Sequence, residues 1–417
     1  MTVVAAETST GIGPAVPVLT TPEAALAAVD AIVPEIARTA VEREVSGSWP
    51  VAELELVAAS GLLGISVPAV VGGPGLPLSV VVEVLRRLAR ADSAVAQLHL
   101  AHYVLIQGIS GLGDREPART IYADILAGAR LGNATVERGT KTSRDRNTRV
   151  RKVGDDWVLD GKKYYATGTL GAAWIAVAAQ IADTDPAHSA TVFVRTTDPG
   201  VRLNLEAWSS FGQQGTASGE VVLDGVRVPD ELVLDEGPAP DPVTAGPTIL
   251  GAYDQALHAA IDIGIARAAL EDGAEFVRTR SRPWFEAQVD SAAEEPHVVR
   301  RFGELTARLY ALEALLRHGT ELIDVAAAEE ELSRDSAAAA SLQVAAAKAL
   351  AQEFAVEIAN GVFELTGTSA TDRALALDRH WRNVRVHSLH DPARWKYVHL
   401  GNHTLHGTRP PVLGVLL

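Results

Sequence analysis

The stretch TRVRKVGDDWVLDGKKYYAT, residues 148–167, decides the fold class of this chain. Apolar and polar residues alternate along it as they do along β-strands, and Asp155-Asp156 and Asp160-Gly161 are turn signals of the kind that joins hairpin strands. Similar β-rich runs, such as WIAVAAQIA, ATVFVRT and GEVVLDGVRVP, continue to about Leu234. We therefore expect a β domain over residues 131–236.

Helical periodicity lies on both sides of this β segment. Four long helices with short connections in the C-terminal part predict a bundle. The expected domains are a mobile tail (1–20), a helical domain (21–130), the β domain and a C-terminal bundle (237–417). Where the helical domain, the β domain and the bundle meet, we expect an internal cleft that suits a cofactor. The expected helices span 21–45, 50–61, 78–92, 93–112, 116–128, 248–281, 296–328, 333–366, 372–387 and a last segment that Asp391 caps and Pro392 begins.

Composition excludes several classes of protein. The 417 residues include 52 acidic and 37 basic side chains, a net charge of −15, which disfavours binding to nucleic acid. The absence of cysteine excludes thiolate nucleophiles, iron–sulfur clusters and cysteine zinc sites. The first basic residue is Arg38 and the apolar stretches are interrupted by Gly and Pro, so we expect a cytoplasmic protein without a membrane span.

Histidines give the strongest indication of chemistry, since six of the 12 fall within the last 38 residues. In HLAHY, His99 and Tyr103 are four residues apart and share one helix face. This face would offer a group that titrates near neutral pH and a phenol donor. The alternative is a helix face packed against a neighbour with both polar tips satisfied.

The segment RNVRVHSLHDP, residues 382–392, brings two more histidines together. His387 is expected at a helix C-terminus, where the helix dipole stabilises an imidazolium, and His390 in the following loop. Capping and loop hydrogen bonding is the alternative interpretation. Further on, the spacing HxxxHxxH lacks an intervening carboxylate, so we expect a polar helix face and no metal site at His399, His403 and His406.

Small polar residues alternate on two expected strands. Asn133 and Thr135 do so in LGNATVERGTK, and Tyr165 and Thr167 in YYATGT, so each pair is predicted to face one side. Amide and hydroxyl donors in such a row suit the edge of a flat heteroaromatic ring. Ordinary hydrogen bonding within the strands is the alternative.

Three arginines lie close together in FVRTRSRPWFE, residues 276–286. Arg278, Arg280 and Arg282 fall within five residues of an otherwise acidic chain, and arginine is the usual bidentate partner of phosphate. A solvated helix end is the alternative. The glycine-rich dinucleotide, P-loop, GxSxG and HExxH signatures are all absent from the sequence.

Two longer segments resemble the acyl-CoA dehydrogenase superfamily: PVAELELVAASGLLGISVPAVVGGPG its second-helix region, and WSSFGQQGTASGEVVLDGVRVP its middle domain. The resemblance implies an α+β multidomain fold with an N-terminal helical domain, a middle β-barrel domain and a C-terminal four-helix bundle. The sequence departs from the family's dehydrogenases at TVERGTKTS, and at Leu389-His390-Asp391-Pro392, where they commonly carry a Tyr-Glu-Gly-Thr segment with the catalytic base. Isovaleryl-type relatives instead keep their base in the first bundle helix.

RNVRVHSLHDPARWKY and HLAHY resemble the two-component (group D) flavin-dependent monooxygenase branch, which includes dibenzothiophene monooxygenases. This resemblance implies reduced FMN supplied by a separate flavin reductase, a C4a-(hydro)peroxyflavin formed with O2, and a homotetramer. The substrate would be small and mostly apolar, oxygenated at sulfur, nitrogen or an aromatic carbon. The alternatives are an FAD-dependent acyl-CoA dehydrogenase and a non-catalytic flavin- or ligand-binding scaffold.

The same resemblance assigns roles to individual residues. It implies that His390, with His387, lies over the reactive face of the flavin, and that Arg282, or alternatively Arg280, binds the FMN phosphate from its own or a neighbouring subunit. The candidates for catalysis are His99, His390, His387, Tyr103 and Asn133. The cofactor-binding candidates are Tyr103, Asn133, Thr135, Tyr165, Thr167, Trp208, Ser218, Arg280 and Arg282.

Overall fold

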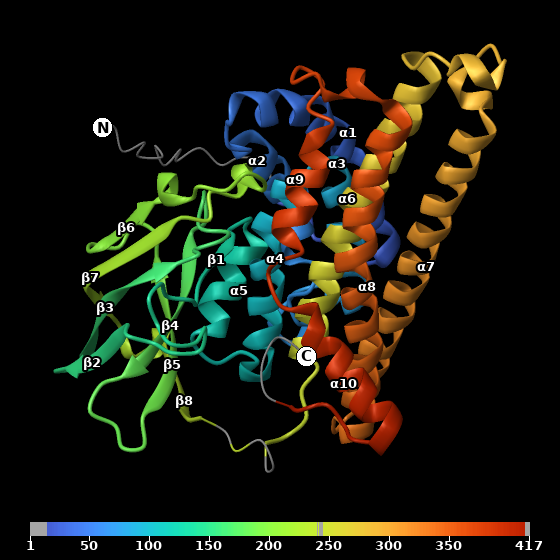
Figure 1. The fold of residues 1–417 in the computed structure, drawn as a ribbon. Helices are drawn as coiled ribbons and strands as arrows, with labels where there is room; N and C mark the ends of the chain where they lie inside the picture. The colour runs from blue at the N-terminus through green and yellow to red at the C-terminus, as the bar shows by residue number, and fades with distance from the viewer. Residues whose placement is uncertain (1–14, 240, 242–244, 413–417) are drawn as a thin grey trace.

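The computed structural model describes residues 15–239, 241 and 245–412, and residues 1–14 of the expected tail lie outside this part. Helices α1 to α5 come first, eight strands follow, and helices α6 to α10 complete the chain (Figure 1). The helices are α1 (Pro22–Ser46), α2 (Val51–Ala59), α3 (Leu78–Ala91), α4 (Ser93–Gly108), α5 (Ala118–Leu126), α6 (Leu250–Thr279), α7 (Pro296–Ala327), α8 (Arg334–Thr366), α9 (Asp378–His387) and α10 (Ala393–His406).

All eight strands belong to one mixed sheet, which the β-rich sequence pattern predicted. They run in the order β6-β7-β3-β2-β4-β5-β8, and β1 pairs with β4 in parallel. The sheet curls around one apolar cluster to which its strands contribute, among others, Val150, Val177, Val192 and Val221. The strands are β1 (Leu131–Ala134), β2 (Arg149–Val153), β3 (Asp156–Tyr164), β4 (Trp174–Ile181), β5 (His188–Arg195), β6 (Val201–Asn204), β7 (Glu220–Val228) and β8 (Val233–Pro238).

Three local predictions were wrong. Asp160-Gly161 is not a turn, because it lies inside β3, where the register with β7 shifts between Leu159 and Gly161. A Cβ at Gly161 would lie 2.3 Å from Thr148 Oγ1, so the bulge brings the backbone against this side chain. Asp391 does not cap α10, because its carboxylate pairs with Lys396. Helix α9 begins at Asp378 rather than at 372.

Helix α6 is the central element of the helical part. It packs against α3, α4, α7, α8 and α9, and its residues are buried along almost its whole length (Figure 1). A helix enclosed on all sides normally carries apolar residues all round. The acidic and imidazole side chains of α6 are therefore exceptional. No helix in the described ranges is both long and apolar enough to span a bilayer.

Candidate active site

Two buried side chains, the imidazole of His102 and the guanidinium of Arg130, join helix α4 to strand β1 and its neighbours. His102 donates from Nε2 to the Leu63 carbonyl at 2.9 Å and accepts at Nδ1 from the Leu131 N–H at 3.1 Å, so its ring is neutral. Arg130 donates to the carbonyl oxygens of Leu98 at 3.0 Å and Gly168 at 2.6 Å. Together they fix the residues that flank His99, Asn133 and Thr167.

His99 is fully buried on α4 and is a neutral acceptor. Because a carbonyl can only accept, Nδ1 carries the hydrogen that it donates to Val95 at 2.7 Å. Nε2 therefore presents a lone pair, and it has no hydrogen-bond partner among the described residues. Burial, and then the charge of Arg130, lower the pKa of His99 well below its ordinary value. The expectation that this ring titrates near neutral pH was wrong.

Tyr103 lies one turn beyond His99 and is also fully buried. Its hydroxyl donates to the Leu62 carbonyl at 3.1 Å, and burial raises the pKa of this phenol above its usual range. The Tyr103 hydroxyl thus has its hydrogen-bond acceptor within the helical region. A contact of Tyr103 with the flavin ring stays a prediction.

Strand β1 and the segments beside it bring four small polar side chains into one row. The Asn133 N–H donates to the Thr167 carbonyl at 3.1 Å, and Thr135 Oγ1 donates to Asn133 Oδ1. Thr167 Oγ1 donates to Ser218 Oγ at 2.9 Å. The contact with Thr135 uses Oδ1 of Asn133 as the acceptor, and the amide nitrogen of Asn133 can only donate. Asn133, Thr135 and Thr167 are only partly buried, so the row is open on one side.

Two aromatic rings border this row. Tyr165 is 47% exposed, and its ring meets that of Trp208 edge to face with centroids 5.7 Å apart. Trp208 Nε1 donates to the Gln213 carbonyl at 2.9 Å, which fixes the indole. These residues of the β domain, with His99 and Tyr103 of α4, which Arg130 links to them through Leu98 and Gly168, are called the first wall below.

A second wall is built from imidazole and charged groups of α6, α8 and α9. His387 is buried and donates from Nδ1 to Asp262 Oδ1 at 2.6 Å, and Lys348 Nζ donates to Asp262 Oδ2 at 2.6 Å. Burial lowers the pKa of His387 in spite of Asp262. The prediction that the helix dipole stabilises His387 as an imidazolium is therefore wrong, because desolvation of the ring outweighs the effect of the dipole.

His390 lies at the surface of this wall. Its side chain is 41% exposed, and its Nδ1 lies 3.6 Å from Asp391 Oδ1. Its ring stacks on that of His258 with centroids 3.9 Å apart. Gln352 Nε2 donates to the Asp391 carbonyl at 2.8 Å and so holds the loop that carries His390. His390 is thus the accessible ring of an otherwise buried cluster.

Sequence reasoning missed the α6 members of this cluster. Asp254, His258 and Asp262 are spaced by four residues each, which places them on one face of α6. That spacing is visible in the sequence and could have identified them. Lys348 gave no comparable signal, because a lone lysine in an alanine-rich helix is usually solvated, and here it is fully buried.

Arg280 and Arg282 lie apart from both walls within one chain. Arg280 follows the C-terminal end of α6, 22 residues after His258, which corresponds to about 33 Å along a helix. Both side chains are exposed, and Arg280 lines an open hollow of about 1080 Å³ bordered by α1, α3, α6 and α7. The structure thus does not bring them to the imidazole cluster of their own chain.

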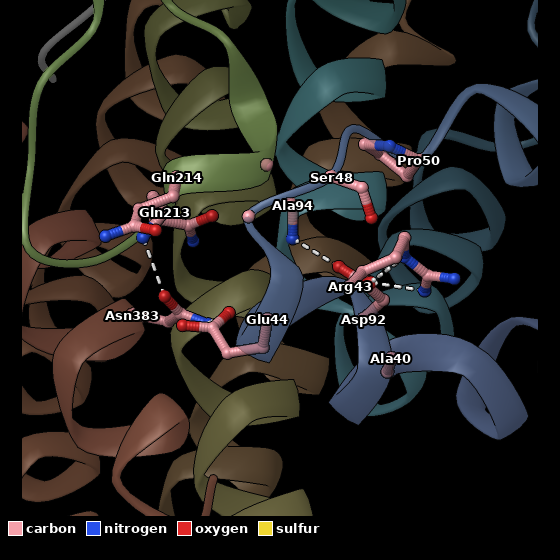
Figure 2. A pocket seen from close by; sticks show the side chains of 12 residues that line it. Ala40, Arg43, Glu44, Ser48, Pro50, Asp92, Ala94, Gln213, Gln214 and Asn383 are labelled. Atoms are coloured by element: carbon pink, nitrogen blue, oxygen red, sulfur yellow. Dashed lines mark hydrogen bonds and ion pairs between the residues drawn. The ribbon is translucent and has the colours of Figure 1, made fainter. Parts of the chain in front are cut away.

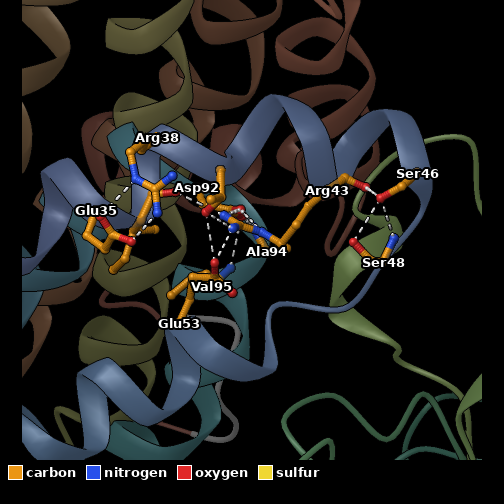
Figure 3. Close-up of polar contacts among 11 residues, drawn as sticks. Glu35, Arg38, Arg43, Ser46, Ser48, Glu53, Asp92, Ala94 and Val95 are labelled. Atoms are coloured by element: carbon orange, nitrogen blue, oxygen red, sulfur yellow. Dashed lines mark hydrogen bonds and ion pairs between the residues drawn. The ribbon is translucent and has the colours of Figure 1, made fainter.

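A polar junction holds the elements of the site in place (Figure 2). Arg43 pairs with Asp92 at 2.6 Å and with Glu53, and Asp92 caps α4 by accepting from the Ala94 N–H at 2.8 Å (Figure 3). On the other side, Asn383 of α9 accepts from the Gln213 N–H at 2.6 Å. The cavity between these groups measures about 20 Å³, the size of one water molecule, so the junction is structural.

The three histidines of α10 differ in exposure. His399 is partly buried beside Trp395, whereas His403 and His406 are exposed. Within the residues that the structure describes, no three histidine, aspartate or glutamate side chains are grouped as metal ligands.

Comparison with known proteins matches this architecture. Residues 23–129 match the family model "Acyl-CoA dehydrogenase, N-terminal domain", and residues 256–395 match "Acyl-CoA dehydrogenase, C-terminal domain". A dibenzothiophene monooxygenase from Rhodococcus erythropolis is 32% identical over 383 residues, which cover 89% of this chain and 91% of the relative. A probable FMNH2-dependent monooxygenase, SfnC, from Pseudomonas putida is 31% identical over 94% of this chain and 98% of its own.

A solved structure gives the same result in three dimensions. FMN-bound TdsC from Paenibacillus sp. A11-2 superimposes with a TM-score of 0.87 at 27% identity, covering 94% of this chain and all of TdsC (100%). The likeness extends through the helical, β and bundle regions. This chain therefore belongs to the acyl-CoA dehydrogenase superfamily, and within it to the branch of flavin-dependent monooxygenases.

Proposed function

We propose that this protein binds reduced FMN between its two walls and uses O2 to oxygenate a small, mostly apolar substrate. The observation that carries the proposal is the row of Asn133, Thr135 and Thr167, which is only partly buried. In addition, the buried Nε2 of His99 has no hydrogen-bond partner among the described residues. A buried acceptor without a partner is costly unless a ligand supplies the hydrogen bond. The relatives named as FMNH2-dependent or FMN-bound support FMN as that ligand.

The donor set of the site fits a reduced flavin. A flavin edge presents both ring N–H donors and carbonyl acceptors, and the first wall offers the complementary pair: an imidazole acceptor at His99 and an amide donor at Asn133. Tyr165 and Trp208 provide the flat apolar border that an aromatic ring system needs. Bound reduced FMN would supply the electrons that activate O2.

The protein's own residues would then position the flavin and exchange protons with the reacting groups. The side-chain amide of Asn133 would donate to negative charge on the ring edge. The Thr167 hydroxyl, whose hydrogen goes to Ser218, and His99 would accept hydrogen bonds. His390, the accessible ring of the second wall, would exchange a proton beside the substrate. The buried aromatic and aliphatic surroundings would keep bulk water out.

Arg282 fits the FMN phosphate only if it comes from another copy of the chain. The separation of about 33 Å along α6 from His258 exceeds the length of an FMN molecule. We therefore propose a homotetramer in which the exposed Arg282, or Arg280, of one copy reaches the site of another. A flavin reductase would supply the reduced FMN, and a cytoplasmic location would bring the two proteins together.

Stopped-flow spectroscopy and isotope labelling test this function. Protein loaded with reduced FMN is mixed with oxygenated buffer, and a slow flavin absorbance phase that free reduced FMN lacks is expected. With ¹⁸O2 and a screen of apolar sulfur and nitrogen compounds, product should carry one labelled oxygen. Reoxidation at the rate of free FMN, with all oxygen recovered as hydrogen peroxide, would contradict the proposal.

A dehydrogenase activity is the second candidate, and Asp254 is the observation that favours it. Dehydrogenation needs a carboxylate base near the flavin, and Asp254 is a buried carboxyl group on the first bundle helix. Anaerobic mixing of the FAD-loaded protein with acyl-CoA compounds of several chain lengths decides the matter. Bleaching of the flavin would support this alternative, and an unchanged spectrum would exclude it for those compounds.

A further inference from the structure

The second wall contains a buried pair of opposite charges that orients a histidine. Asp262 and Lys348 are both 0% exposed at their side chains and are joined at 2.6 Å. The other carboxylate oxygen of Asp262 accepts from Nδ1 of His387 at 2.6 Å. Because Nδ1 donates, a neutral His387 presents a lone pair at Nε2. The ion pair thus fixes which nitrogen of this ring can accept a proton.

That fixed acceptor orients a second ring. His258 Nδ1 lies 3.1 Å from His387 Nε2, and only His258 can donate across this contact. Nε2 of His258 is consequently an acceptor, and it lies 3.8 Å from Oδ1 of Asp254, one helical turn earlier. This distance is within ion-pair range but too long for a hydrogen bond, so the two side chains must approach each other before a proton can pass. In the order Asp254, His258, His387, each residue can therefore donate a hydrogen and the next one can accept it.

Asp254 is suited to hold an exchangeable proton. It is 6% exposed, and Gln255 Nε2 donates to its Oδ2 at 3.0 Å. Burial raises the pKa of Asp254 to about 6, with the nearby carboxylate of Asp391 in support and the charges of His390 and Lys348 opposed. Lys396, which pairs with Asp391, is the remaining cation that acts on the cluster.

We propose that Asp254 and His258 form a buried proton relay beneath His390. In one transfer, the O–H bond of Asp254 breaks, an N–H bond forms at Nε2 of His258, and the Nδ1 hydrogen of His258 passes to Nε2 of His387. No electron is transferred, and Asp262 faces the imidazolium that results. The resulting charge lies on His387, whose ring centroid is 5.1 Å from that of His258, and His258 stacks under His390 at 3.9 Å. The charge therefore acts on His390 through space, and no proton passes between the stacked rings.

The relay rests on the proposed function and adds to it a positive charge on His387, which favours transfer of a proton from His390 to the reacting group. Insertion of one oxygen atom of O2 into a substrate releases the other as water, and that water must receive protons while bound FMN and substrate would keep bulk water out. Asp254 and His258 act through His390, so they are positioning residues. None of the first-wall groups could serve, because His99 is a buried neutral acceptor and Tyr103 holds its proton too tightly.

Infrared spectroscopy of the flavin-free protein tests the relay without any turnover. Between about pH 5 and about pH 7 the carbonyl band of a protonated carboxyl group should disappear with a midpoint near 6, and Asp254→Asn should remove this change. Asp272→Asn is the matched control on the same helix. The partners His380 and Arg379 overcome burial and lower the pKa of Asp272 to about 2, so its removal should leave the band unchanged.

Two substitutions at His258 separate proton transfer from packing. His258→Asn retains a donor at the position of Nδ1 but cannot pass a proton on, whereas His258→Phe retains the ring under His390 but makes no hydrogen bond. Product formed per reduced FMN should fall in wild type as the pH rises through about 6. Both variants, and Asp254→Asn, should lose this dependence and lie at least about tenfold below the wild-type maximum.

The outcomes distinguish this inference from the proposed function. If His258→Phe keeps the wild-type pH profile, His258 contributes only packing. If His258→Asn keeps it, His258 contributes only a hydrogen-bond donor. Either result overturns the relay. A carboxyl band that persists in Asp254→Asn also overturns it. If wild type forms no oxygenated product while the band titrates as expected, the proposed function fails and the buried acid–base pair stands.

Discussion

At the scale of single residues, His390 and its neighbours separate accessible chemistry from buried support. The ring of His390 is 41% exposed, whereas the hydrogen bonds from Asp262 through His387 to His258 run entirely beneath it. Removal of the exposed ring should therefore leave the support intact. This separation makes His390 the position at which chemistry can be removed without disturbing the fold.

We expect His390→Ala to lose product formation by about a hundredfold while FMN binding is largely kept. Leu389→Ala, which removes an exposed neighbour from the same loop, is the control and should retain activity. The measurement is product formed per reduced FMN, together with FMN affinity from flavin fluorescence. Unchanged product per reduced FMN in His390→Ala would remove the assigned role.

The pKa of Asp254 makes folding stability depend on pH. Its folded-state value of about 6 lies above the ordinary 3.8, so the folded chain binds this proton more tightly than the unfolded chain. The resulting gain is fully present below about pH 4 and is lost as the pH rises through about 6. Asp254→Asn should therefore match wild type near pH 4 and exceed it by up to about 3 kcal/mol near pH 8.

Denaturant unfolding at several pH values measures this difference. A variant that is less stable than wild type at pH 8 would show that the ionised carboxylate stabilises the fold, against the effect of burial. Asp272→Asn gives the opposite sign and serves as the comparison. Because the pKa of Asp272 is lowered to about 2 by its partners, its loss should destabilise the protein near neutral pH.

At the scale of elements, α1 holds α4 in position through a buried cation. Arg43 joins Asp92, the cap of α4, to Glu53 of α2, and all three side chains are largely buried (Figure 3). Arg43→Met leaves two buried carboxylates without their partner and should destabilise the protein by about 3–5 kcal/mol. Arg38→Met, which removes an exposed ion pair with Glu35 on the same helix, should have no measurable effect.

Thermal and denaturant unfolding of both variants test this arrangement. Equal stability of Arg43→Met and Arg38→Met would show that the junction does not hold α4. Because α4 carries His99, a loosened cap should also weaken FMN binding in Arg43→Met alone. That second measurement links the stability of the junction to the geometry of the first wall.

The sequence predicted elements where a local pattern was sufficient. Long periodic runs located α6, α7 and α8 to within about two residues, because periodicity in a long helix is a strong signal. The bulge at Gly161 was predicted as a turn, because Asp-Gly has the same local signature in both settings and only pairing with β7 distinguishes them.

The candidate site shows the same division. Alternation on strands predicted that Asn133 and Thr135 share a side, as do Tyr165 and Thr167, and hydrogen bonds link Asn133 to Thr135 and to Thr167. Ser218, which was named from the family resemblance, bonds to Thr167. Protonation could not be predicted, since the pKa values of His99 and His387 depend on burial by residues distant in sequence. Arg130 was overlooked for a similar reason, as its three carbonyl acceptors are provided by folding alone.

At the scale of the whole molecule, the position of Arg282 predicts that one copy of the chain has an incomplete site. The far end of α6 is about 33 Å along the helix from His258, so the phosphate anchor and the imidazole cluster of one site would belong to different copies. Arg282→Ala should weaken FMN binding sharply, whereas Arg278→Ala, an exposed arginine paired with Glu275, should not. An unaltered FMN dissociation constant in Arg282→Ala would remove the phosphate assignment.

Mixed assemblies provide the decisive form of this prediction. When Arg282→Ala and His390→Ala chains are co-expressed, some sites combine an intact Arg282 from one copy with an intact His390 from another. Random association in a closed homo-oligomer makes about a quarter of the sites complete, so activity at limiting FMN should recover to about a quarter of wild type. If both residues served the site of their own chain, every site would carry one lesion and mixing would restore nothing. Recovery of activity from two impaired variants can therefore arise only from a site shared between copies.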